Sequence, residues 1–316
     1  MEKTAVVKKF IAFLISLLIM GFIFTRIDFN QFKSYLAQVD PWLFVLAVLF
    51  FVPQIALTAY RWTVMIRSQT KMQLWESVRL TLAANALNIL LPSRVGDLSK
   101  AYFIGRQGRV DLKRGMNVVF FEKYIDLVSL GVVVLAGVLF SGRWDSASLA
   151  GLGFSAAVLG IFPVLYFVDL ERWTSLTLFK KNRLLGKVGR FLRDTHDYLK
   201  EVRQNPRLLV FIVGLSIFLW FVHILQFYLI FQAFHSQVSL FHVFRLVPLA
   251  ILVGLVPLTL AGMGTRDSAL IFLFSPYENA ALVAGVGLFA SLRYFVPGIL
   301  GLPFLNQYVL KTDSSR

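Results

Sequence analysis

Long apolar runs, separated by short polar loops, set the pattern of the chain. A run of about 20 apolar residues spans a bilayer as a helix. The runs here are continuous and do not alternate apolar with polar residues as the strands of a membrane barrel do. The pattern therefore predicts an all-α, polytopic helical membrane protein, with about six full spans at 9–26, 41–61, 115–140, 148–168, 207–232 and 279–310.

Two further apolar segments, 77–91 and 241–275, are interrupted by proline and glycine. The first break reads LPSRVGD and the second reads VPLTLAGMGTRD. Irregular backbone at membrane depth persists only where protein or water covers it. Both segments are therefore predicted to be re-entrant or broken helical hairpins; the alternative for the second is two separate spans, 241–260 and 264–275. The residues expected to break the helices are Pro92, Gly96, Pro257, Gly262 and Gly264.

Clusters of Lys and Arg predict the orientation. They precede the first apolar run and fill three loops, 61–79, 106–114 and 172–207. Basic loops stay in the cytoplasm, so both termini are predicted to be cytoplasmic. The protein is expected in the cell (cytoplasmic or inner) membrane. Because the first two basic loops must share one side, the segment between them cannot cross once. It must enter the membrane and return, with its tip near LPSRVGD.

The two broken segments also resemble each other. VRLTLAANALNILLPSRVGDLSKAYFI and FRLVPLAILVGLVPLTLAGMGTRDSALIF each carry Arg-Leu, an apolar arm, a proline, and then Gly, Arg and Asp around the break. Inverted repeats with broken helices are typical of transporters. The expected organisation is one integral membrane domain, 1–316, with inverted halves 1–147 and 148–316. The alternative is that Pro and Gly kink two ordinary spans.

The longest polar stretch, 169–206, is too short for a normal catalytic domain. Within it, LLGKVGRFLRDTHDYLKEVR places apolar residues on one helical stripe and charged residues opposite. This pattern predicts a cytoplasmic loop with an amphipathic helix on the inner leaflet, or a solvated linker helix.

Composition narrows the chemistry. The net charge of +15 would suggest nucleic acid in a soluble protein, but here basic loops facing anionic lipid explain it. The chain has no Cys, and its four His are not spaced like a metal site. No metal, cofactor or nucleic-acid partner is expected.

Charged residues within the apolar segments are the candidate site, because such residues are costly in a membrane and normally face a cavity or a partner. Glu122 and Asp126 share a helix face, four residues apart. Arg94 and Arg266 are their expected cations and phosphate ligands, since Arg grips carboxylate and phosphate through two parallel hydrogen bonds, while Lys123 is expected to point elsewhere. Alternatively, these charges only fix the hairpins in place. The substrate-binding candidates are Arg94, Arg266, Glu122, Asp126, Asn88, Asp97 and Asp267.

Three blocks carry a family resemblance: NILLPSRVGDLSKAYFIGRQGR, VFFEKYIDLVSL and LAGMGTRDSALIF. In this order they resemble the membrane region of lysylphosphatidylglycerol synthase/flippases and of standalone members of that superfamily. The family's motif positions fall on Pro92, Arg94, Gly96, Glu122, Asp126, Gly264, Thr265 and Arg266.

The resemblance implies lipid or glycolipid handling in a multi-pass membrane protein. In bifunctional members this region resembles a flippase, and lysyl transfer belongs to a separate soluble domain after it, which is not expected here because the chain ends at Arg316. The expected function is a flippase-like lipid transporter without catalytic residues, handling anionic phospholipid or a lipid-linked glycan. The alternatives are an integral membrane enzyme and a non-catalytic partner of a separate lipid-modifying or glycosyl transferase.

Overall fold

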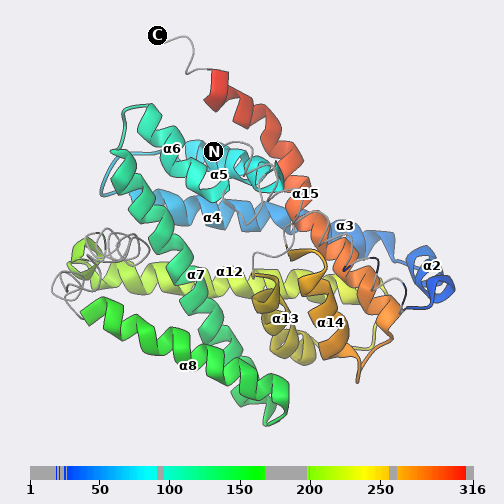
Figure 1. Cartoon of the computed structure of the whole chain (residues 1–316). Helices are drawn as coiled ribbons and strands as arrows, with labels where there is room; N and C mark the ends of the chain where they lie inside the picture. Colours follow the sequence, from blue (N-terminus) through cyan, green and yellow to red (C-terminus); the bar gives the residue numbers. More distant parts are fainter. Residues whose placement is uncertain are drawn as a thin grey trace.

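The computed structural model describes residues 27–90, 96–167, 200–255 and 262–310, together with Ile19, Gly21, Thr25 and Tyr198. Every regular element within these residues is a helix (Figure 1). The all-α prediction is therefore confirmed. The helices are α2 (Phe29–Ala37), α3 (Pro41–Leu49), α4 (Phe51–Ile66), α5 (Leu74–Leu90), α6 (Ser99–Arg106), α7 (Leu112–Ser141), α8 (Ser146–Phe167), α12 (Pro206–Ala233), α13 (Leu240–Gly254), α14 (Thr265–Phe274) and α15 (Ala280–Leu310).

Four helical segments in the described part of the chain are long and apolar enough to cross a membrane: Pro41–Ile66, Leu112–Ser141, Pro206–Ala233 and Ala280–Tyr308. They coincide with four of the predicted spans. Helix α8 covers the span predicted at 148–168 as one helix of 22 residues. The span predicted at 9–26 lies almost wholly outside the described residues. The class predicted from sequence, a polytopic helical membrane protein, is confirmed.

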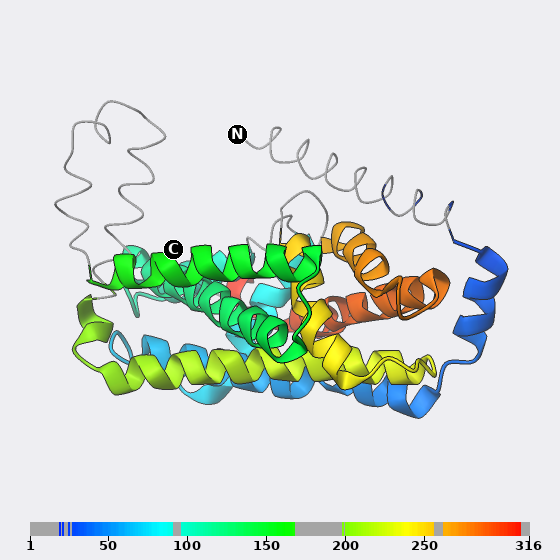
Figure 2. The same cartoon turned by 90° about the horizontal axis from the view of Figure 1, so that it is seen from below.

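The first long span is broken between α3 and α4, three residues before Pro53. Proline lacks an N–H group and its ring clashes with the carbonyl one turn earlier, so it weakens a continuous helix. Helix α12 runs alongside this break (Figure 2). From α12, the Gln226 side chain donates a hydrogen bond of 2.8 Å to the Ala47 carbonyl and accepts one of 2.9 Å from Gln54. The two glutamines thus tie the broken span to its neighbour.

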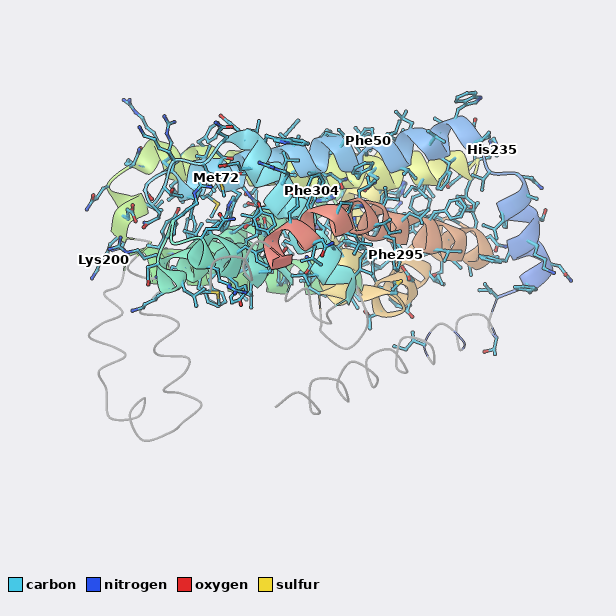
Figure 3. All side chains as sticks on the ribbon, turned by 90° about the horizontal axis from the view of Figure 1, so that it is seen from above. Phe50, Met72, Lys200, His235, Phe295 and Phe304 are labelled. Carbon is cyan, nitrogen blue, oxygen red and sulfur yellow. The ribbon has the colours of Figure 1, made fainter. Side chains whose placement is uncertain are left out.

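Helices α5 and α6 form the first predicted hairpin, beside α4 (Figure 1). Beyond α6, the Arg109 guanidinium donates a hydrogen bond of 2.8 Å to the Lys71 carbonyl. It also lies 3.2 Å from the carboxylate of Glu76, near the start of α5. The two basic loops therefore lie together, and the chain between them enters and returns. In Figure 3, Met72 and Lys200 lie toward one end of the molecule and His235 lies at the other. Pro92 and Arg94 lie outside the described residues.

The return of this hairpin depends on Gly96. A Cβ atom on Gly96 would lie 2.5 Å from the Asn88 amide nitrogen and 2.6 Å from the Ala84 carbonyl oxygen, both backbone atoms of α5. Real Cβ contacts are not that short, so only glycine allows the chain to fold back this closely. The prediction of Gly96 as a hairpin break is consistent with this contact.

Helices α13 and α14 form the second hairpin (Figure 1). Gly262 and Gly264 have φ angles of +78° and +94°, which L-residues with side chains rarely adopt. Helix α14 has 10 residues and therefore rises only about 15 Å, too little to cross a bilayer alone. This favours a hairpin over two separate spans. Pro257 lies outside the described residues, and the inverted repeat of the two halves remains a prediction.

Helix α15 packs closely on α5 through two glycines. A Cβ atom on Gly301 would lie 2.0 Å from the Leu82 carbonyl oxygen, and one on Gly298 would lie 2.0 Å from the Ile89 side chain. Small residues let membrane helices approach to backbone contact. The first hairpin is thereby held against the last span.

The cytoplasmic loop predicted at 169–206, with its amphipathic helix, lies mostly outside the described residues. Its end is described, and Tyr198 and Val202 are buried there among residues of α4 and α7. The Tyr198 hydroxyl donates a 2.7 Å hydrogen bond to the Met65 carbonyl near the end of α4. This contact anchors the loop where α4 leaves the helical core.

Candidate functional site

A cluster of buried charges lies where α4 meets α7. The Arg61 guanidinium lies 3.0 Å from the Glu122 carboxylate and 2.5 Å from the Asp126 carboxylate. It also donates a 2.6 Å hydrogen bond to the Ser216 hydroxyl of α12. Glu122 and Asp126 present the same face of α7, as their spacing predicts. One arginine therefore joins three helices.

The first hairpin adds its own charges to this cluster. The Lys100 ammonium of α6 lies 2.7 Å from Glu122, and 4.6 Å from the centre of the Trp62 ring. The Lys123 ammonium lies 2.5 Å from Asp97 and 3.7 Å from Asp126. We name Arg61, Lys100, Lys123, Asp97, Glu122 and Asp126 the charged cluster; its three cations and three carboxylates balance.

The charged cluster has a buried half and an accessible half. The side chains of Arg61, Lys100 and Glu122 are 3%, 1% and 0% exposed. Those of Lys123, Asp126 and Asp97 are 44%, 25% and 15% exposed. A fully buried charge depends on its partners, because leaving one unpaired is strongly destabilising. The accessible half of the cluster is destabilised less when one of its ion-pair partners is exchanged for water or for another ion.

The charged cluster borders a cavity of about 540 Å³, a size typical of small-molecule sites. The cavity lies between the two hairpins: Asn88 and Asp97 reach it from the first, and Gly254 and Gly262 from the second. Asn88 also donates a 3.0 Å hydrogen bond to Asp97. Figure 3 labels Phe295, another residue of the wall, between the two ends of the molecule.

The rest of the cavity wall is largely apolar. Among the described residues it includes Phe51 and Ile55 of α4, Phe120 of α7, and Leu219 and Trp220 of α12. The cavity lining therefore combines the charged cluster with aromatic and aliphatic side chains. Such a cavity suits a ligand that has one charged part and one apolar part.

Helix α15 contributes one more cation, Arg293, to this wall. With Arg61, Lys100 and Lys123, the described lining carries four cationic side chains against three carboxylates. The described part of the lining therefore carries one formal positive charge in excess. In the part of the chain that the structure describes, no three His, Asp or Glu side chains gather in a way that could hold a metal ion.

The structure brings together four of the predicted site residues, Asn88, Asp97, Glu122 and Asp126. Arg94 lies outside the described residues. The expectation for Lys123 was wrong: it pairs with Asp97 and Asp126 instead of pointing away.

The predicted pairing of Arg266 with Glu122 and Asp126 is also wrong, while its role in substrate binding stays a prediction. Its guanidinium pairs with the adjacent Asp267 at 2.6 Å and donates to the Gly287 carbonyl and the Ser291 hydroxyl of α15, at 2.7 and 3.0 Å. Both Arg266 and Asp267 are buried, and neither contacts Glu122 or Asp126. They tie the second hairpin to α15.

The sequence reasoning missed two cations of the charged cluster, Arg61 and Lys100. Arg61 stands at the end of an apolar run and begins a series of basic residues, so the sequence pattern placed it in a cytoplasmic loop. Helix α4 continues to Ile66, which places Arg61 more than a turn inside the helix. The two carboxylates at 122 and 126 were the available signal, since they require a buried cation from somewhere in the chain.

Together, the membrane-spanning helices, the two broken hairpins and the charged cavity define a polytopic helical membrane protein with a central polar site. Residues 9–301 match the family model described as Lysylphosphatidylglycerol synthase TM region. The chain belongs to this family.

Its relatives include UPF0104 membrane proteins of two archaea. One from Methanothermobacter thermautotrophicus is 26% identical over 313 residues, covering 89% of this chain and 90% of the relative. One from Methanocaldococcus jannaschii is 26% identical over 188 residues, covering 59% of this chain and 78% of the relative. A second from that organism is 22% identical over an alignment of 340 residues that covers 100% of this chain and 99% of the relative.

Proposed function

We propose that the protein is a flippase-like lipid transporter whose cavity takes the phosphate-bearing headgroup of a lipid while the acyl chains stay in the bilayer. We place it in the cell membrane with both termini in the cytoplasm, because the basic loops lie at one end. The observation that carries the proposal is the cavity between two broken hairpins, whose lining combines the charged cluster with many apolar side chains. Broken helices around a central site are the usual transporter arrangement.

The two halves of the charged cluster have different roles in this proposal. Arg61, Lys100 and Glu122 hold α4, α6 and α7 together. Lys123 and Asp126, which are more accessible, exchange partners when a headgroup enters. A charged headgroup thereby replaces part of its hydration with fixed protein charges, which lowers the cost of bringing it to membrane depth.

Lipid movement by purified protein in liposomes tests this function. Fluorescent lipids with different headgroups report transfer between leaflets, and the cavity is blocked by Thr58→Trp, at a position on its wall. The matched control is Ala56→Trp, on the same helix at an exposed position outside the lining. Both changes add the same side chain to α4, so only one fills the cavity.

The wild-type protein and Ala56→Trp are expected to accelerate movement of at least one phosphate-bearing lipid, and Thr58→Trp is expected to abolish it. Equal movement by the two variants contradicts transport through this cavity. Failure of the wild-type protein to move any phosphate-bearing lipid contradicts the function.

A further inference from the structure

Asp97 has an ion pair that an arriving anion can break. Its carboxylate lies 2.5 Å from the Lys123 ammonium, and no other cation of the described residues lies within ion-pair distance of it. Lys123 also lies 3.7 Å from Asp126, which has a second cation in Arg61 at 2.5 Å. Loss of Lys123 would therefore leave Asp126 with an ion pair and Asp97 with none among the described residues.

The side-chain amide of Asn88 is the neutral partner of Asp97. Its Nδ2 donates a 3.0 Å hydrogen bond to the Asp97 carboxylate. Its Oδ1 is buried and has no hydrogen-bond partner within the described part of the chain. An amide donates to a carboxylate and, after turning about its last bond, accepts from a carboxylic acid. Asn88 therefore suits Asp97 with or without a proton, whereas the Lys123 ammonium suits only the charged form.

Polar side chains of α5 provide a route for water to this carboxylate. Thr81, Asn85 and Asn88 all line the cavity, and their spacing of four and three residues places them on one helix face. Thr81 is 3% exposed, and its hydroxyl has no partner among the described residues. Buried polar groups without a protein partner are normally hydrogen-bonded to water. This face therefore suits water that reaches Asp97 along α5.

Several other charged or titratable groups share the cavity with Asp97. In the described lining they are Arg61 on α4, Lys100 on α6, Glu122, Lys123 and Asp126 on α7, His223 on α12, and Arg293 and Tyr294 on α15. Lys100 is engaged by Glu122 at 2.7 Å. Histidine ordinarily gains a proton near neutral pH, so His223 is the competing proton acceptor.

We propose that Asp97 is a proton-binding site and that each phosphate-bearing headgroup crosses the membrane together with one proton. This inference rests on the proposed function, because the phosphate is the group that draws Lys123 away from Asp97. The Lys123–Asp97 ion pair breaks, and Lys123 pairs with a phosphate oxygen. Asp97 then takes a proton from the water of the cavity onto one carboxylate oxygen, since a buried carboxylate without a cation is costly and is neutralised instead. One negative and one positive charge enter together, so the loaded site keeps the charge of the empty one.

Calorimetry on purified protein in detergent counts this proton without requiring transport. Short-chain phosphatidylglycerol and short-chain phosphatidylcholine are titrated at pH 7 in two buffers of different ionisation enthalpy. Neither phosphodiester gains a proton near this pH, so any proton taken up goes to the protein. The variants are Asp97→Asn and His223→Gln. The matched control is Asp111→Asn, at an exposed position outside the cavity lining, where asparagine also caps α7.

The wild-type protein, Asp111→Asn and His223→Gln are expected to take up about one proton per lipid bound, and Asp97→Asn none. If Asp97→Asn cannot be purified, Lys123→Gln decides the question. Without Lys123, Asp97 has no ion pair to lose, so binding should again bring no proton.

The outcomes separate the proton from the lipid. Binding by the wild-type protein without proton uptake overturns this inference alone. Uptake that persists in Asp97→Asn, or that disappears in His223→Gln, overturns Asp97 as the acceptor. Failure to bind either lipid refutes the proposed function as well.

A pH gradient across liposomes tests the coupling during transport. A lipid that moves with one proton accumulates in the leaflet facing the alkaline side, by up to about tenfold for one pH unit. Fluorescent phosphatidylglycerol should show this enrichment with the wild-type protein and not in protein-free liposomes, and Asp97→Asn should lose it. Rapid movement of the lipid by the wild-type protein, with no enrichment under the gradient, overturns the coupling and leaves transport intact.

Discussion

Replacing Arg61 with methionine tests whether the charged cluster holds the helices together. Methionine has a similar length and is apolar, so the change removes the charge and its hydrogen bonds while filling much of the space. Glu122 would keep Lys100 at 2.7 Å, and Asp126 would keep only Lys123, at 3.7 Å. The main loss of stabilising interactions is therefore the ion pair with Asp126 and the hydrogen bond from α4 to Ser216.

The expected loss of stability follows from burial. Removing one partner of a buried ion pair costs about 3–5 kcal/mol. Because Lys100 still compensates Glu122 and the Asp126 side chain is 25% exposed, we expect the low end, about 3 kcal/mol. Since ~1.36 kcal/mol is a factor of ten, this corresponds to roughly a hundredfold or slightly more in the unfolding equilibrium.

Equilibrium unfolding in mixed micelles, with increasing denaturing detergent, measures this change. Arg67→Met is the control, because Arg67 is exposed just after the same helix. Asp126→Asn in the Arg61→Met background should reduce the cost of losing Arg61 by about 1–3 kcal/mol, as expected for directly coupled residues. If Arg61→Met is no less stable than Arg67→Met, the cluster does not hold the helices together.

Three further predictions follow from the fold. Gly301→Ala should separate α15 from α5 and destabilise the protein, as unfolding in mixed micelles will show, because the new Cβ would lie 2.0 Å from an α5 carbonyl. Ser68→Cys and Gln107→Cys, each alone in a chain without Cys, should react with a membrane-impermeant thiol reagent from the same side, since both basic loops lie together. The hydrogen bond from Arg245 lowers the pKa of Asp145 to about 2, below its value of about 3.9 in the unfolded chain. The ion pair of Asp145 with Arg245 therefore stabilises the folded protein above about pH 4, and this stabilisation is lost as the pH falls toward 2. The difference in thermal midpoint between wild type and Asp145→Asn should close over that interval.

Each of these predictions has a control. Gly153→Ala adds a methyl group in a helix where nothing lies within 4 Å, so a comparable loss there would discredit the packing argument. Gln237→Cys, at the opposite end beside His235, should be labelled from the other side of the membrane. Labelling of Ser68→Cys and Gln107→Cys from opposite sides would refute the first hairpin. A difference for Asp145→Asn that persists at pH 2 would refute the ion pair as its cause.

The features predicted correctly from sequence are local ones. Apolar length identifies a span, and a proline or glycine interrupts it within a few residues. The basic loops indicated that the chain between them returns, and the Arg109 contact with Lys71 agrees. Glu122 and Asp126 were placed on one face because a helix fixes the spacing of side chains four residues apart.

The partners of these carboxylates could not be predicted in the same way. Arg61 precedes Glu122 by 61 residues, and only the packing of α4 on α7 brings them together. Arg266 was matched with distant carboxylates although Asp267 stands beside it. The glycines at 298 and 301 carried no signal of their own, because the need for a small side chain arises from the position of α5.

The balance of the charged cluster has an electrical consequence. Moving one elementary charge through a membrane potential of 100 mV changes its energy by about 2.3 kcal/mol. Three cations and three carboxylates that move as one body carry no net charge through that field. Voltage therefore neither drives nor opposes a displacement of the cluster, and any voltage dependence of the protein must come from charges outside it.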